Sequence, residues 1–249
     1  QATVTHELLE QLEGAPDILV VPVGGGGLSS SARRLLMERA PDTEIFYVEP
    51  TGGKSLAAAV LAGEPTTIKN VDTFVDGAAV ACIGKHTFAA LKGIDADHVL
   101  AIPEDRICTT ILEMLNIEGV VLEPAGALAL DALKDLKEKI KGKTVVCVSS
   151  GGNFDSERLP EVKERAQRFA GVKKYFILRM PQRPGALKDF LGLLGPDDDI
   201  SRFEYLKKSA RNFGTVLLGV ETSSPENFVS LLERLENAGM SIRDITGDE

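Results

Sequence analysis

Short apolar runs alternate with amphipathic segments along the first two thirds of the chain. The runs are rich in valine and isoleucine and bounded by turn residues, which is typical of strands buried on both faces of a parallel sheet. The expected strands cover residues 18–23, 44–50, 97–103 and 144–153. Between them apolar positions recur at helical spacing, and the expected helices cover residues 28–40, 55–63, 104–116 and 123–142. Strands that alternate with helices predict an α/β domain built on a parallel sheet.

One amphipathic segment, residues 156–170, follows this domain. Its apolar residues recur at the spacing that places them on one face of a helix. These residues are Leu159, Val162, Ala166 and Phe169. We expect this helix to connect the first domain to the rest of the chain.

The remaining residues follow a different pattern, in which two strands are neighbours in sequence. The expected strands cover residues 173–180, 199–208, 214–222 and 241–246, and the expected helices cover residues 184–194 and 225–239. The resulting βαββαβ order predicts a ferredoxin-like domain. We place the domain boundary near Gly171 and Val172, which gives domains of residues 1–171 and 172–249.

The composition narrows the functional classes without selecting one. The 249 residues are 43% hydrophobic and 26% charged, which is ordinary for a globular protein. No apolar run approaches the roughly 20 residues that cross a membrane. A net charge of −9 without a basic stripe argues against nucleic acid as a partner. Three cysteines without a CxxC spacing indicate buried thiols in a reducing compartment, so we expect a cytoplasmic protein.

Four consecutive glycines, Gly24 to Gly27, stand between the first expected strand and the first expected helix. Glycine loses more backbone entropy on folding than any other residue, so such a run needs a reason. A glycine loop before a helix is an anion cradle, because backbone N–H groups and the positive end of the helix dipole meet there. No Cβ keeps a phosphate away from the backbone. We expect the loop to hold a phosphate, although a plain tight turn would also use glycine.

Two classes of ligand fit this loop. The dinucleotide fingerprint Gly-x-Gly-x-x-Gly matches Gly24 and Gly26, but its third glycine falls on Ser29. An acid at the end of the second strand would bind the ribose, and Glu49 stands there. The other class is a single phosphate monoester held by loop amides alone. The loop does not decide between the two classes.

Four further segments occur in fixed order after the loop segment "VPVGGGGL" (21–28). They are "VEP" (48–50), "VDGAAV" (75–80), "LEPAGALAL" (122–130) and "VSSGGN" (148–153). The set strongly resembles the pyridoxal-phosphate enzymes of the tryptophan-synthase-β type. Within that group it resembles the threonine dehydratases (threonine ammonia-lyases) and the related serine dehydratases and serine racemases. The resemblance covers residues 1–170 and rests on the whole set of segments.

The resemblance implies a set of residues around pyridoxal 5'-phosphate. They are Gly24, Gly25, Gly26, Gly27, Leu28, Gly77, Glu123 and Ser150. The glycines and the Leu28 amide would hold the phosphate, and the Ser150 hydroxyl would meet the pyridine nitrogen. A serine does not keep that nitrogen protonated as a carboxylate would, which favours prompt β-elimination. Asp76 and Glu123 also have plainer interpretations, as a turn residue and as an acid at a helix start.

The sequence departs from this family pattern at two places. Some relatives bind a divalent ion with the glutamate of "VEP" and an aspartate six residues on, where this chain has Ser55, so we expect no metal. The relatives attach the cofactor to a lysine upstream of the glycine loop, whereas the first lysine here is Lys54. A lysine is needed to hold the aldehyde and to move the α-proton. We therefore expect a C-terminal part of the enzyme that lacks the Schiff-base lysine and is inactive alone.

The second domain resembles the ACT-like regulatory domain of biosynthetic threonine dehydratase, in a single copy. The matching segments are "RPGAL" (183–187), "FEY" (203–205) and the acidic turn "PDDDI" (196–200). The resemblance implies isoleucine as feedback inhibitor and valine as opposing effector. Leu187, Phe203 and Tyr205 are the candidate effector contacts, although each could instead be a core residue. Paired sensor domains in the family imply a homo-oligomer.

The implied activity is the deamination of L-threonine to 2-oxobutanoate and ammonia, the first step of isoleucine biosynthesis, under allosteric feedback. Serine dehydratase or racemase activity within the same family is one alternative. Two further alternatives are an NAD-binding module with a regulatory tail and a non-catalytic amino-acid sensor.

Overall fold

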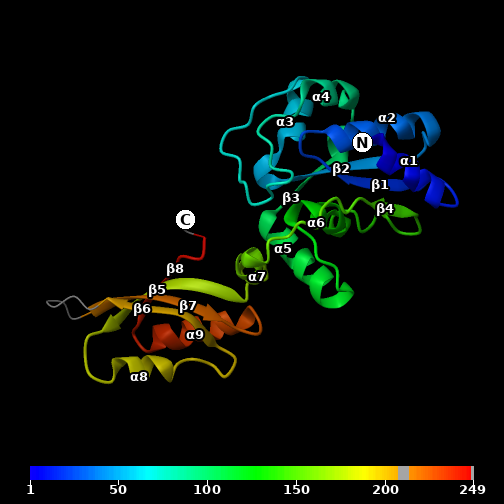
Figure 1. The fold of residues 1–249 in the computed structure, drawn as a ribbon. Coiled ribbons are helices and arrows are strands. Elements are labelled where there is room, and N and C mark those ends of the chain that lie inside the picture. Colours follow the sequence, from blue (N-terminus) through cyan, green and yellow to red (C-terminus); the bar gives the residue numbers. More distant parts are fainter. Residues whose placement is uncertain (207–212, 248–249) are drawn as a thin grey trace. The chain divides into compact units, whose positions relative to one another are not determined.

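The computed structural model describes residues 1–206 and 213–247, and the chain forms two compact units, Gln1–Lys163 and Glu164–Glu249 (Figure 1). Each unit has its own sheet and its own buried core. The limit between the units falls inside helix α7 (Leu159–Phe169). The sequence places the domain boundary slightly later, after residue 171, and that placement stays a prediction.

The first unit is built on a parallel sheet with the strand order β3-β2-β1-β4. The strands are β1 (Ile18–Pro22), β2 (Glu44–Pro50), β3 (Val99–Ile102) and β4 (Val145–Cys147). Every residue of β1 is buried, as expected for an inner strand that is covered on both faces. The predicted α/β domain with a parallel sheet is confirmed.

Helices surround this sheet (Figure 1). They are α1 (Ala2–Gln11), α2 (Gly27–Arg39), α3 (Ser55–Ala62), α4 (Lys85–Leu91), α5 (Glu104–Glu113) and α6 (Pro124–Asp131). Helix α2 packs Ala32 and Leu36 against Leu19 of β1. A second cluster joins Val21 of β1 to Phe88 and Leu91 of α4. The packing of α2 and α4 against the inner strand fixes the position of the loop between β1 and α2.

The prediction of one helix over residues 123–142 is wrong beyond Asp131. A 3-10 turn follows α6 at Ala132–Lys134. After it the backbone hydrogen bonds mix the i to i+3 and i to i+4 patterns. The Leu136 carbonyl oxygen, for example, accepts bonds from the N–H groups of both Lys139 and Ile140. Residues of α6 are nearly all buried, whereas residues 137–143 are mostly exposed and rich in lysine. Without an apolar face to bury, the lysine-rich end does not continue the α-helix.

Helices α1 and α4 have no counterpart in the sequence prediction. Helix α1 buries only Thr5 completely, and α4 buries only Phe88 and Leu91. Neither helix therefore shows the continuous apolar face on which a helix prediction depends. The omission matters because both helices contribute to the candidate site.

The second unit is an antiparallel sheet with the strand order β6-β7-β5-β8. Its elements are β5 (Lys173–Pro181), α8 (Ala186–Leu191), β6 (Asp199–Leu206), β7 (Phe213–Glu221), α9 (Glu226–Asn237) and β8 (Ser241–Asp244). This order and this sheet confirm the predicted ferredoxin-like plan. Residues 207–208, the expected end of a strand, lie outside the described residues.

Helices α8 and α9 cover one face of this second sheet (Figure 1). The core between them contains Phe176 of β5, Phe190 of α8 and Phe228 of α9, all at most 2% exposed. The ring centroids of Phe176 and Phe228 are 6.0 Å apart. Large aromatic side chains supply much of the buried area that a small unit needs.

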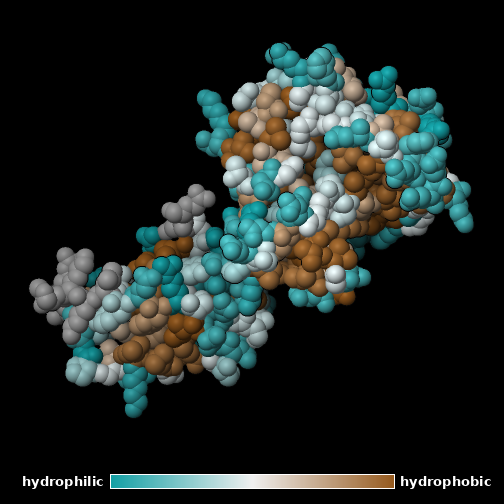
Figure 2. All heavy atoms as spheres, in the orientation of Figure 1, coloured by the Kyte–Doolittle hydropathy of each residue, from teal (hydrophilic) through white to brown (hydrophobic). Residues whose placement is uncertain are grey.

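The surface of each unit mixes polar side chains with areas of apolar ones (Figure 2). Leu61 and Ile117 are among the exposed apolar side chains of the first unit. Single exposed apolar residues are common on protein surfaces and indicate no particular partner. No helix in the described part of the chain is long and apolar enough to span a membrane.

Candidate functional site

The glycine loop joins β1 to α2 and turns at Gly26. This residue immediately precedes α2 and has a φ of +84°, a left-handed conformation that residues with a Cβ rarely adopt. The first N–H groups of a helix have no partner within that helix. Gly27 and Leu28 therefore offer backbone donors at the positive end of the α2 dipole, and the first turn of α2 holds no acidic residue.

Three of the loop glycines, Gly24, Gly26 and Gly27, lie close to other segments, and a Cβ at Gly27 would overlap Oε1 of Gln1. A Cβ at Gly24 would lie 3.2 Å from the carbonyl oxygen of Gly77. A Cβ at Gly26 would lie 2.9 Å from Oγ1 of Thr87. A Cβ at Gly25 would meet no heavy atom within 4 Å. The loop is therefore closely packed at Gly24, Gly26 and Gly27 and is open at Gly25.

The serines that follow the loop bond to its backbone. The hydroxyl groups of Ser29, Ser30 and Ser31 donate to carbonyl oxygens of Gly26 and Gly27 at 3.3, 3.2 and 2.7 Å. These bonds support the first turn of α2. They leave the backbone N–H groups as the donors that the loop offers to a ligand.

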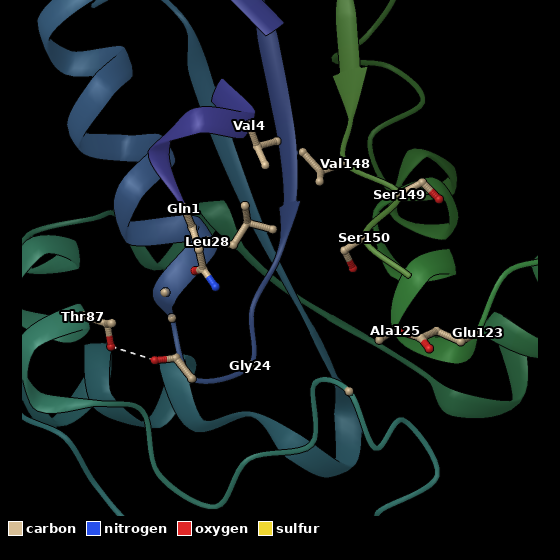
Figure 3. Close-up of a pocket in the computed structure, with 14 residues that line it drawn as sticks. Gln1, Val4, Gly24, Leu28, Thr87, Glu123, Ala125, Val148, Ser149 and Ser150 are labelled. Atoms are coloured by element: carbon tan, nitrogen blue, oxygen red, sulfur yellow. Dashed lines mark hydrogen bonds between the residues drawn. The ribbon is translucent and has the colours of Figure 1, made fainter. Parts of the chain in front are cut away.

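A cavity of about 710 Å³ opens beside the loop and brings together residues from distant parts of the first unit (Figure 3). All the residues predicted to surround the cofactor line it, namely Gly24, Gly25, Gly26, Gly27, Leu28, Gly77, Glu123 and Ser150. The residues that sequence reasoning missed are Gln1, Val4, Thr87, Ala125, Val148 and Ser149. The last three of these, Ala125, Val148 and Ser149, lie within the segments 122–130 and 148–153, which could have indicated them.

Asp76 is not among the described residues that line the cavity. Its Oδ1 accepts a hydrogen bond from the Gly77 N–H at 2.9 Å, which is the behaviour of a turn residue. Among the described lining residues, Glu123 is the one charged side chain, and no lysine or arginine is present. An anion in this cavity would therefore depend on backbone N–H groups and the α2 dipole.

The wall opposite the loop forms where the turn after β4 meets the start of α6. The Gly151 carbonyl oxygen accepts a bond from the Glu123 N–H at 3.3 Å, and Ser149 Oγ donates to the Gly126 carbonyl oxygen at 3.2 Å. A Cβ at Gly126 would overlap the Gly151 carbonyl oxygen. This close contact holds Ser150 and Glu123 across the cavity from the glycine loop (Figure 3).

Glu49, the candidate ribose ligand, is fully buried and is not among the lining residues. Its two carboxylate oxygens accept bonds from the N–H groups of Leu56 and Ala57, at 2.6 and 2.9 Å, in the first turn of α3. Burial raises the pKa of Glu49 to about 7, although these amide bonds act in the opposite direction. The carboxyl group therefore caps α3 and is not available to a ribose.

Acidic, histidine and cysteine side chains do not gather into a group of three able to hold a metal ion within the described residues. The expectation that no divalent ion binds stays a prediction. The cysteines Cys82, Cys108 and Cys147 form no disulfide with one another, and only Cys108 is fully buried. Burial raises the pKa of Cys147 to about 11, which keeps this thiol protonated at neutral pH.

The three candidate effector residues lie in different surroundings of the second unit. Phe203 packs at the edge of the core, with its ring centroid 6.1 Å from that of Phe190. Leu187 is 44% exposed on α8, so a core role does not apply to it. Tyr205 is 36% exposed, and its ring lies across Gly214. Their role as effector contacts stays a prediction.

The loop, the cavity and the serine turn correspond to a known class of enzyme. Residues 1–151 match the family model described as pyridoxal-phosphate dependent enzyme. The chain belongs to this family, and the predicted cofactor class, pyridoxal 5'-phosphate, is confirmed. Residues 164–249 match the model for the C-terminal regulatory domain of threonine dehydratase. The dinucleotide alternative is wrong, because both the family and the buried position of Glu49 oppose it.

The chain is a homologue of biosynthetic threonine dehydratases. It is 44% identical to the biosynthetic L-threonine dehydratase IlvA of Bacillus subtilis, over 100% of this chain and 59% of that protein. The processed form of threonine deaminase isoform 2 from Solanum lycopersicum has a similar fold, with a TM-score of 0.61 and 34% identity over 66% of this chain and 48% of that chain. Maize serine racemase gives a TM-score of 0.58 and 28% identity over 66% and 52%. The chain thus spans about three fifths of the length of the curated relatives.

Replacing Gly26 by alanine is expected to destabilise the first unit by about 1–2 kcal/mol, because alanine pays that cost in a left-handed conformation. The new Cβ would also press on Thr87. Urea unfolding of the two variants Gly26→Ala and Gly25→Ala would measure the effect. We expect the second variant to be the more stable, because a Cβ at Gly25 meets no neighbour. Equal losses in both would show that the loop is not fixed as described.

Proposed function

We propose that this chain forms the cofactor-phosphate site and the regulatory domain of a threonine dehydratase. The phosphate site is the loop Gly24 to Leu28, and the enzyme deaminates L-threonine to 2-oxobutanoate and ammonia in isoleucine biosynthesis. The observation that carries the proposal is the cavity at the start of α2, where loop glycines, Glu123 and Ser150 come together. Homology to biosynthetic threonine dehydratases along the whole chain supports it. Because those relatives are longer, the activity is proposed for the enzyme of which this chain is a portion.

The residues of the cavity fit the cofactor. Phosphate would lie against the N–H groups of Gly24 to Leu28, where a Cβ at Gly24 or Gly26 would crowd neighbouring segments. The hydroxyl of Ser150 would meet the pyridine nitrogen from the opposite wall (Figure 3). Pyridoxal phosphate supplies an electron sink for bonds broken at the amino-acid Cα. A neutral hydroxyl holds the ring without protonating it as a carboxylic acid would, which suits rapid β-elimination.

We further propose that the lysine that holds the cofactor aldehyde and moves the α-proton is not in this chain. Lys54, the first lysine, is not among the described lining residues, and neither is any later lysine. A general base must come within hydrogen-bond reach of the proton that it removes. This chain alone is therefore expected to turn over no threonine.

The test compares the chain alone with the complete enzyme, each supplied with pyridoxal phosphate and L-threonine. We expect 2-oxobutanoate only from the complete enzyme, measured by its hydrazone absorbance or by mass spectrometry. Parallel reactions with L-serine separate a dehydratase, which forms pyruvate, from a racemase, which forms D-serine. Failure of the complete enzyme to release 2-oxobutanoate would overturn the proposed activity, and product from the chain alone would overturn the proposed position of the lysine.

The second unit is proposed to bind isoleucine as inhibitor and valine as its opponent, in a cytoplasmic homo-oligomer. Its independent core supports a separate sensor, and so does its match to the regulatory domain of threonine dehydratase. Feedback requires that an effector bind two arrangements of the enzyme with unequal affinity. Isothermal titration with each amino acid tests this part, and the absence of binding heat with both would contradict it.

A further inference from the structure

Thr87 lines the cavity at one side of the glycine loop and bonds to the loop backbone. It belongs to the first turn of α4, and its Oγ1 lies 2.7 Å from the Gly25 carbonyl oxygen and 2.9 Å from the Gly84 carbonyl oxygen. A hydroxyl has one proton to donate, and the shorter of the two contacts is the one to Gly25. The Gly84 N–H approaches the same Gly25 oxygen at 3.4 Å. The Gly25 carbonyl is therefore the point at which α4 holds the loop.

The side chain of Thr87 also fills the space beside Gly26. A Cβ at Gly26 would lie 2.9 Å from Thr87 Oγ1 and 3.0 Å from Thr87 Cβ. A Cβ at Gly84 would lie 2.9 Å from the same Oγ1. Glycine at these two positions lets the threonine come close enough to bond to the loop. The tight packing described for Gly26 therefore serves this contact.

The bond to Thr87 determines which way one peptide group of the loop faces. In a trans peptide the C=O and the N–H point in opposite directions. With the Gly25 carbonyl turned toward Thr87, the N–H of Gly26 turns to the other side of the loop. Figure 3 shows Thr87 on one side of the loop and Ser150 and Glu123 on the other, across the cavity. The Gly26 N–H therefore points away from Thr87, toward the side of the loop on which Ser150 and Glu123 line the cavity.

We propose that Thr87 is a positioning residue for the phosphate of the cofactor, because its hydroxyl keeps the Gly26 N–H directed into the cavity. The inference rests on the proposed function, since it assumes that the loop holds that phosphate. Glycine is permissive in both φ and ψ, so the Gly25–Gly26 peptide can rotate once its carbonyl is released. Binding would then have to order the peptide, and an ordering cost of this kind weakens affinity.

The test uses the complete enzyme freed of cofactor and measures dissociation constants of pyridoxal phosphate and pyridoxal by equilibrium dialysis. Both molecules carry the same aldehyde and ring, so their affinity ratio isolates the phosphate. Thr87→Val removes the hydroxyl and keeps the shape, whereas Thr87→Ser keeps the hydroxyl. We expect the valine variant to bind pyridoxal phosphate about three- to tenfold more weakly, the effect of one lost hydrogen bond, with pyridoxal unchanged. The serine variant should retain the wild-type ratio.

Each other outcome contradicts the inference in a distinguishable way. An unchanged ratio in Thr87→Val would mean that the hydroxyl does not position the loop, while the proposed function still stands. Equal weakening for both molecules would assign Thr87 a general structural role. A wild-type enzyme that binds pyridoxal as tightly as pyridoxal phosphate would contradict both the proposed phosphate site and the role of Thr87. If the valine variant does not fold, Thr87→Ala removes the same donor without adding a methyl group, and the same ratio decides.

Discussion

An enzyme with alanine in place of Gly126 is expected to lose about 3 kcal/mol of stability, at the upper end of the usual cost of overpacking. Gly126 is buried in α6, and a Cβ there would overlap the Gly151 carbonyl oxygen and lie 3.1 Å from the Gly151 carbonyl carbon. These are backbone atoms, so no side-chain rotation can relieve the clash. Either α6 or the turn after β4 must move, and the turn carries Ser150. We therefore expect cofactor affinity to fall together with stability.

Urea unfolding measures this loss, and hydrogen exchange of peptides from β1 and α6 assigns it to the first unit. Gly152→Ala is the matched control, because it adds the same methyl group to the turn after β4, at the residue that follows Gly151. A Cβ at Gly152 would meet only the Val121 carbonyl oxygen at 3.4 Å, an ordinary contact. The control is expected to stay within about 0.5 kcal/mol of the wild type. Two variants of equal stability would mean that the contact between α6 and the turn is not as tight as described.

The first unit is expected to lose stability as the pH rises from about 4.5 to about 7. Burial raises the pKa of Glu49 from 4.5 to about 7 in the folded chain. Below this range the carboxyl group is protonated in both states. Within it the unfolded chain releases the proton while the folded chain retains it, so ionisation stabilises the unfolded state relative to the folded state. A shift of this size corresponds to about 3 kcal/mol, all of it lost once the pH exceeds the folded-state pKa.

Urea unfolding of the wild type at pH 5 and pH 7.5 tests the sign, again with hydrogen exchange to follow the first unit. Glu49→Gln is the control, because the amide cannot ionise and its oxygen can still accept one of the bonds from the start of α3. Other groups titrate in both proteins, so the difference between the two pH profiles isolates Glu49. The prediction fails if the glutamine variant shows the same pH dependence as the wild type.

The fold follows from patterns that the sequence displays directly. The apolar run of β1 and the four glycines after it indicate a buried strand, a loop and a helix start, and the structure has these elements. The adjacency of β6 and β7 without an intervening helix indicates the ferredoxin-like plan. The expected helix over residues 123–142 is longer than the one in the structure. Lysines suit the last turn of a helix, but they do not extend a helix that has no apolar face to bury.

The site could be predicted wherever a residue belongs to a recognisable segment. Ser150 and Glu123 lie within such segments, and the cavity contains both. Thr87 could not be found in this way, since it lies outside those segments and its bond to Gly25 forms only after folding. Glu49 is a candidate ribose ligand only in the dinucleotide alternative, because its position at a strand end does not reveal that the amides of α3 bond to its carboxyl group.

The strand order of the second unit leaves β6 and β8 as the two edges of its sheet. Open edges offer unpaired N–H and C=O groups to strands of other chains and so invite aggregation. Both edges here carry exposed charges, Arg202 and Glu204 on β6 and Arg243 and Asp244 on β8. A strand that paired with either edge would have to crowd these charged side chains or remove their hydration water. The charges on both edges therefore disfavour pairing of this small sheet with strands of other chains.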